Sequence, residues 1–176
     1  MRDAPGMADF VHPDLEPRTF DFLTEQGHVG LERVAKKRRD PAIVEPAKRA
    51  IAALAQIYAR LKGDPSVLPA ARANLLLTVH ARGDQVVALD GPEHFTSFRA
   101  LTLELYPPEV PLGFDRDQYL HLCAEQAPTS DRIDRALAAK GFGFGGVPRE
   151  RAYRDALVDL AVPAMGLPPV IRVPDL

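Results

Sequence analysis

A histidine beside two carboxylates is the feature of this sequence that comes nearest to catalytic chemistry. His94 follows Glu93 directly and comes four residues after Asp90, in a segment expected to be a loop after a β-hairpin. An acid and a base on such a loop could meet a substrate and exchange protons with it. An ordinary surface histidine is the other interpretation, and the sequence leaves both open.

A second pair of carboxylates, Asp155 and Asp159, lies four residues apart in a segment expected to be helical. This spacing puts both on one helix face, as in carboxylates that bridge metal ions. No partnering histidine accompanies them. We therefore expect both side chains to lie in solvent beside Arg151 and Arg154.

The other candidate ligands do not form a metal site. His121 and Cys123 are two residues apart, and on a helix such residues point about 200° from each other. Cys123 is the only cysteine, which excludes an internal disulfide and a cysteine cage around zinc. The sequence therefore predicts a protein without metal and without cofactor.

The stretch GFGFGGVPRERAYRDAL matches the pattern G-x-G-x-x-G at Gly141, Gly143 and Gly146. In a dinucleotide site a strand precedes this pattern, whereas here we expect a helix over 130–140, which Gly141 would end in a left-handed conformation. The Lys-Ser or Lys-Thr of a phosphate-binding P-loop does not follow. The pattern thus favours a structural loop over a nucleotide site. We expect two aromatic side chains to pin this loop into apolar pockets, those of Phe142 and Phe144.

The segment LCAEQAPTSDRIDRALAAKGF resembles the helix-turn-helix motif of DNA-binding proteins. The resemblance implies a turn at Pro128 between two helices, with Ile133 and Leu137 facing inward on the second. That second helix would also present Asp131 and Asp134, and carboxylates that face phosphates are unfavourable. We therefore expect an ordinary helical hairpin here.

Positive charge is concentrated in one part of the chain. Residues 31–63 carry 9 basic and 3 acidic side chains, although the protein has a net charge of −2. Several basic side chains on one face can hold the phosphates of a polyanion, nucleic acid foremost, while a plain solvated surface is the alternative. The candidate binding residues are Arg33, Lys36, Lys37, Arg38, Arg39, Lys48, Arg49, Arg60 and Lys62.

The composition indicates a soluble globular protein, with 46% hydrophobic and 26% charged residues. No apolar run approaches the ~18 residues that span a bilayer, and the first residues lack the apolar segment of a secretory signal. We expect a cytoplasmic protein that does not contact membranes. The 17 arginines against 5 lysines suggest a bacterial genome rich in G and C.

The elements that must position these residues form an α+β fold that is mostly helical, with several short helices bounded by prolines. The strongest helical pattern covers 45–62, where an apolar stripe includes Ala47, Leu54 and Leu61. A β-hairpin near 75–89 should form one small antiparallel sheet, to which the carboxyl-terminal PPVIRVPDL could add an edge strand. Further helices are expected within 92–106, 115–126, 130–140 and 148–162.

These patterns predict a flexible lead-in over residues 1–13 and a single helix-rich globular domain over 14–176. The leading hypothesis is an intracellular interaction protein that binds a polyanion through its basic helical face, and that contacts itself or a protein partner through its acidic remainder. The alternative hypothesis is a small soluble enzyme whose acid–base set is His94, Glu93 and Asp90. Convergence of those three residues in a cleft would favour the enzyme, whereas alignment of Lys36 to Arg39 with Lys48, Arg49 and Arg60 on one open face would favour binding.

Overall fold

The computed structural model describes residues 41–67, 79–82, 85–164 and 166–176. Helices α3 (Pro41–Arg60), α4 (Ser97–Glu104), α5 (Arg116–Ser130) and α6 (Val147–Ala164) make up half of it. A 3-10 turn, η3 (Pro92–His94), precedes α4. Three strands, β1 (Val79–Arg82), β2 (Gln85–Asp90) and β3 (Ile171–Pro174), form the sheet. The predicted mostly helical fold is therefore confirmed.

The sheet is mixed, with strand order β1-β2-β3. β1 pairs antiparallel with β2, in the segment where the hairpin was predicted, and β2 pairs parallel with β3. The prediction of an antiparallel sheet is thus wrong for the sheet as a whole. The reason is a crossover: the chain passes through three helices after β2 and returns to pair with β2 on the side away from β1, in the same direction as β2, which a hairpin cannot do.

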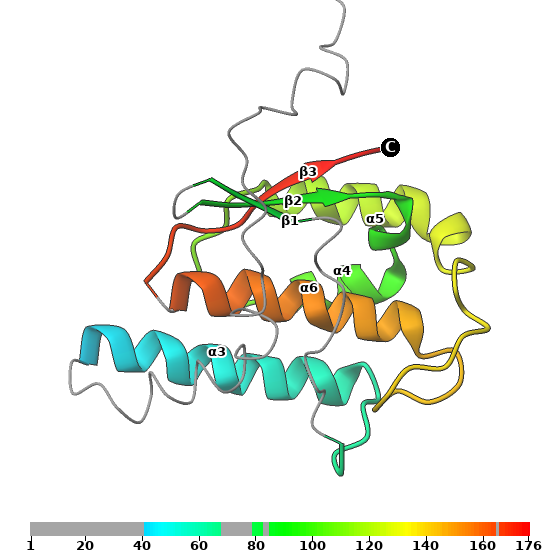
Figure 1. Cartoon of the computed structure of the whole chain (residues 1–176), viewed down its shortest axis with the longest axis horizontal. Coiled ribbons are helices and arrows are strands. Elements are labelled where there is room, and N and C mark those ends of the chain that lie inside the picture. Colours follow the sequence, from blue (N-terminus) through cyan, green and yellow to red (C-terminus); the bar gives the residue numbers. More distant parts are fainter. Residues whose placement is uncertain (1–40, 68–78, 83–84, 165) are drawn as a thin grey trace, which may run out of the picture.

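Helix α6 lies at the centre of the fold, between α3 on one side and the sheet on the other (Figure 1). Its side chains are buried nearly all round, as expected for a helix covered on several faces. Towards the sheet, Val158 and Val162 pack with Val86, Ala88 and Val170. These contacts hold β2 and the residue just before β3 against the carboxyl-terminal half of α6.

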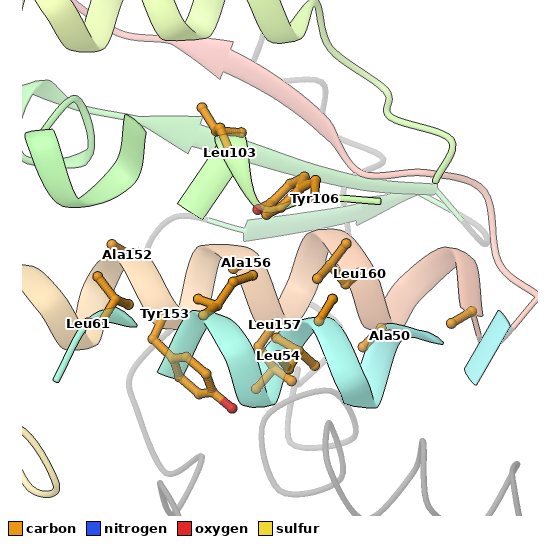
Figure 2. Packing of buried hydrophobic residues seen from close by; sticks show 14 of the residues in the cluster. Ala50, Leu54, Leu61, Leu103, Tyr106, Ala152, Tyr153, Ala156, Leu157 and Leu160 are labelled. Atoms are coloured by element: carbon orange, nitrogen blue, oxygen red, sulfur yellow. The ribbon is translucent and has the colours of Figure 1, made fainter. Parts of the chain in front are cut away.

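Figure 2 shows the other side of α6, where it packs on α3. Leu54 of α3 and Leu61, just past its end, meet Tyr153 and Leu157 of α6 in one large apolar cluster. The predicted stripe of α3 forms this interface, since Leu54, Ile57 and Leu61 are all buried. The helix is confirmed, although it begins at Pro41, so that Pro46 lies inside it.

Helix α4 begins at a local signal, because the hydroxyl of its N-cap residue Thr96 accepts the backbone N–H of Arg99 at 3.1 Å. Helix α5 begins in the same way at Asp115, whose carboxylate accepts the N–H groups of Asp117 and Gln118. These caps set where the helices start. The start of α4 in turn fixes Arg99 with its side chain directed into the core.

The helix expected over 130–140 does not form, and neither does the helix-turn-helix arrangement. α5 continues through Pro128 to Ser130, and a series of turns follows it, in which Asp134 has a left-handed φ of 57°. The carboxylate of Asp134 accepts a hydrogen bond from Arg151 at 2.6 Å, so a contact with α6 holds the turn in place. Tertiary contacts have overridden the local helical pattern here.

The segment of residues 141–146, here called the glycine loop, follows these turns and leads into α6. Gly141 has the predicted left-handed conformation, with φ +82°, although no helix ends at it. Phe142 is buried against Tyr58 and Tyr153, as expected, but Phe144 is 81% exposed, so the prediction of an apolar pocket for it is wrong. The loop therefore docks through one aromatic residue and presents the other to solvent.

Candidate active site

A cluster of buried charges lies where β2, β3, α4 and α6 meet. Each of these elements contributes at least one charged residue, and every one of the five is at most 5% exposed. The cluster contains three carboxylates and two guanidinium groups: Asp90, Asp155, Asp159, Arg99 and Arg172. Burying charges costs several kcal/mol for each ion unless partners and hydrogen bonds compensate, so the contacts within this cluster matter.

Arg172 is the centre of the cluster. From the middle of β3 it donates to both oxygens of Asp90 at 2.8 and 2.9 Å. Its Nε donates to Asp159 Oδ1 at 2.7 Å, and its Nη2 reaches Asp155 Oδ1 at 3.2 Å. One side chain therefore joins three carboxylates from β2 and α6, and the planar guanidinium is suited to this because it carries five donors.

Arg99 completes the cluster from α4. It donates to Asp159 Oδ2 at 2.7 Å and to the hydroxyl of Tyr106 at 2.7 Å, and Tyr106 in turn donates to Asp159 at 2.8 Å. Burial raises the pKa of Tyr106, which keeps this hydroxyl neutral and able to donate. Both oxygens of Asp159 are therefore satisfied, which makes this part of the cluster a structural clamp between α4 and α6.

His94 lies at the edge of the cluster, at the end of η3. Its Nδ1 is 2.9 Å from Asp155 Oδ2 and 3.7 Å from Asp90 Oδ1. Nε2, on the other side of the ring, is 3.9 Å from Glu93 Oε1. The side chain of His94 is 10% exposed and that of Glu93 is 34% exposed, whereas Asp90 and Asp155 are almost fully covered. The imidazole thus lies between the buried carboxylates and the more exposed Glu93.

The protonation of this edge follows from its charges. Burial lowers the pKa of His94, but the Asp155 carboxylate, helped by Asp90, more than offsets this, and the pKa is raised above its ordinary value of 6.5. Burial by itself raises the pKa of Asp155, but His94 and Arg172 hold that pKa well below its usual range. Three carboxylates against two guanidinium groups leave one negative charge, which a protonated His94 neutralises.

The same three side chains are the candidate metal ligands of the part of the chain that the structure describes. One ligand atom each from Asp90, His94 and Asp155 lie within 4.8 Å of one another. Arg172, however, already occupies Asp90 with two hydrogen bonds and also contacts Asp155. A cation here would have to displace the His94 proton and lie beside a fixed positive charge, so the donor set fits a proton better. The metal-free state stays a prediction.

Cys123 does not belong to the candidate chemistry. It is fully buried in the apolar cluster, and burial raises the pKa of its thiol to about 11. The thiolate is the reactive form, so this cysteine is an unreactive core residue.

The structure brings some of the predicted site residues close together and leaves others apart on the surface. It places Asp90 and Glu93 3.7 and 3.9 Å from the two ring nitrogens of His94. Among the basic residues, Arg33 and Lys36 to Arg39 lie outside the described residues. Lys48 and Arg49 are exposed and pair with Glu45 and Glu109 at 3.0 and 3.3 Å. The remaining two, Arg60 and Lys62, are exposed near the end of α3.

Asp155 and Asp159 are the main correction to the predicted site. Both were expected in solvent, but they are 3% and 2% exposed and bind His94 and the two buried arginines. The missing partner histidine lies 61 residues away in the sequence. A signal was present in the flanking residues: Asp159 stands within LVDLAV and Arg172 within VIRV, and a charge inside an apolar run indicates a buried partner.

Comparisons with known proteins leave the interpretation to this geometry. No family model, no curated protein and no solved structure matches the chain. Within the described residues, the helices are too short or too polar for any of them to cross a bilayer.

Proposed function

We propose that this protein is a small enzyme that transfers protons by general acid–base catalysis through His94. The observation that carries the proposal is the 2.9 Å contact between His94 Nδ1 and Asp155 Oδ2, on the side of the cluster where the partly exposed Glu93 lies near the imidazole. A base that is oriented by a third, buried group is the recurring arrangement of catalytic histidines. Asp155 is the orienting group here.

The roles follow from the two sides of the imidazole ring. Asp155 holds Nδ1, fixes the ring and stabilises its positive charge, so Nε2 is the atom that exchanges a proton with substrate. The raised pKa makes the protonated ring a substantial species near neutral pH, which suits a general acid that becomes a base after giving up its proton. Glu93, partly exposed and 3.9 Å from Nε2, is placed to orient a water molecule or a substrate hydroxyl.

The other charged residues of the cluster support this site without touching substrate. Arg172 and Arg99 are fully occupied by Asp90, Asp155 and Asp159 inside the core, so they are positioning residues. Arg172 places the Asp155 carboxylate and counters its charge. The reaction class that matches this arrangement is hydrolysis, or another reaction in which a proton moves to or from an oxygen atom of a small polar substrate.

Accessibility of Nε2 is the first test. Diethyl pyrocarbonate acylates a reachable imidazole nitrogen, and mass spectrometry of the digested protein identifies the modified histidine. We expect His94 to be modified in the folded protein, as His121 on the surface of α5 will be. If His94 reacts only after unfolding, no substrate can reach its Nε2 and the proposal fails.

Turnover is the second test. Hydrolysis of p-nitrophenyl acetate and p-nitrophenyl phosphate is compared for the parent, His94→Gln and the matched control His121→Gln, which changes an exposed histidine paired with Glu125. We expect His94→Gln to lower the rate by roughly 100-fold or more and the control to leave it unchanged, with no effect of EDTA. An unchanged rate in His94→Gln would remove His94 from the chemistry.

A further inference from the structure

A groove of about 440 Å³ opens between the end of α3, the exposed side of α4 and the start of α6. Arg60 and Lys62 line it at the end of α3, and Phe98 and Leu101 line it from α4. Gly145 and Arg149 line it near the start of α6. Its volume is within the range of small-molecule sites, roughly 300–1,000 Å³. The proposed acid–base site does not use it.

The groove has three positive charges and no carboxylate among its described lining residues. Arg149 donates to the carbonyl oxygens of Phe142 at 2.7 Å, Phe144 at 3.4 Å and Leu61 at 3.5 Å, so its guanidinium is held in place. Within the described part of the chain, neither Arg60 nor Lys62 forms an ion pair. Lys48 and Arg49, on the same helix as Arg60, do have acidic partners.

The backbone around the groove adds to this field. α6 begins beside Gly145 and Arg149, and the amino end of a long helix carries partial positive charge. Lys62, just past the end of α3, has a left-handed φ of 59°, which is uncommon for a residue other than glycine. The carboxyl end of α3 carries partial negative charge and repels an anion. The charged side chains must therefore supply the net attraction.

The groove also has an apolar surface. Phe98 and Leu101 pack on the core with one side and remain partly exposed with the other. On the adjoining glycine loop, Phe144 is 81% exposed between Gly143 and Gly145, both with φ +66°. Phe144 is not a lining residue of the groove, so the apolar surface of the groove is that of Phe98 and Leu101.

We propose that this groove binds an organic anion with an apolar body, its acid group on Arg60, Lys62 and Arg149 and its body on Phe98 and Leu101. The proposal is independent of the acid–base site, because Arg149 and Asp155 are six residues apart and about 120° around α6 from each other. A small ligand is favoured over nucleic acid, because the neighbouring Lys48 and Arg49 are already paired with carboxylates.

The ligand chemistry is tested by calorimetric titration of the full chain. Phenyl phosphate and 4-phenylbutyrate carry the two acid groups that the cations could bind, and inorganic phosphate, acetate and phenol each lack one half of the ligand. We expect saturable binding of at least one of the first two, at least roughly tenfold tighter than the incomplete probes. No saturation of either by about 10 mM overturns the proposal.

The location is tested with paired double variants that remove the same charge. Arg60→Gln with Lys62→Gln should weaken binding by roughly tenfold or more, because two charge-assisted contacts are lost. Lys48→Gln with Arg49→Gln, on exposed sites with acidic partners, should change it less than twofold. Arg149 is left intact because its hydrogen bonds support the loop.

Equal losses in the two double variants would show that overall charge, not the groove, binds the probe, and would overturn the proposal. A single-stranded oligonucleotide is titrated as well. If the oligonucleotide binds and phenyl phosphate does not, the proposal would be replaced by a polyanion-binding face.

Discussion

His94 is the residue on which the electrostatics of the cluster depend. The five fully buried charged groups leave one unit of negative charge, and among the described residues that contact them His94 is the group able to cancel it. In the proposed mechanism, the proton that balances the charge of the core is the one that leaves Nε2. Stability and the proposed catalysis are therefore coupled through a single titration.

This coupling predicts a pH-dependent effect of His94→Gln on the free energy of unfolding. The pKa of His94 is raised in the folded state, so its stabilising contribution is fully present below the unfolded value of about 6.5 and is lost as the pH rises through the folded pKa. We expect the variant to be less stable than the parent by roughly 2 kcal/mol at pH 5.5, and by clearly less at pH 9.

Urea denaturation across this pH range measures the difference, and NMR titration of the imidazole gives the folded pKa. His121→Gln serves as the control, with an expected change within about 0.5 kcal/mol because His121 is exposed. A destabilisation by His94→Gln that is constant from pH 5.5 to pH 9 would contradict the assignment of a charged histidine in the cluster.

At the scale of elements, the glycine loop depends on a close contact and not only on its backbone conformation. Gly141 has φ +82°, and a Cβ on it would lie 2.7 Å from the hydroxyl oxygen of Tyr58. That hydroxyl is 2.8 to 3.2 Å from the carbonyl oxygens of Asp64, Val67 and Gly141. Tyr58 thereby joins the end of α3 to the loop before α6.

We predict that Gly141→Ala destabilises the protein more than Gly143→Ala does. Both positions are left-handed, so both variants incur the steric cost of about 1–2 kcal/mol, but nothing lies within 4 Å of a Cβ at Gly143. Gly141→Ala must also displace Tyr58 and its hydrogen bonds, which should add about 1 kcal/mol or more. Thermal unfolding of the two variants measures the difference, and equal losses would mean that Tyr58 does not hold the loop.

The elements that local patterns determine could be predicted from the sequence. The stripe of α3 and the proline and glycine that follow it marked that helix, and VIRV marked the edge strand β3. The region 131–140 could not be predicted, because its turns depend on the Arg151–Asp134 hydrogen bond from another element. Local propensity favoured a helix there, and the tertiary contact decided otherwise.

The site shows the same division at the scale of the whole molecule. Asp90, Glu93 and His94 are neighbours in the sequence, so their association could be predicted. Asp155 and Arg172 reach the site from α6 and β3, which required knowing that β3 pairs parallel with β2. A prediction that places β3 simply at an edge does not say which carboxylates its arginine will face.

Because Arg172 connects the sheet to α6, its removal should destabilise the whole molecule. Arg172→Met leaves Asp90, Asp155 and Asp159 with too little positive charge in a buried site, and breaking a buried ion pair in this way costs about 3–5 kcal/mol. The urea midpoint should fall accordingly with an unchanged m-value. Arg172→Lys keeps the charge but not the planar fork, so we expect an intermediate loss.

Arg49→Met removes an exposed arginine paired with Glu109 and should cost no more than about 1 kcal/mol. If Arg172→Met were as mild as Arg49→Met, the cluster would not be what holds β3 to α6, and the apolar contacts of Val158, Val162 and Val170 would have to do so alone.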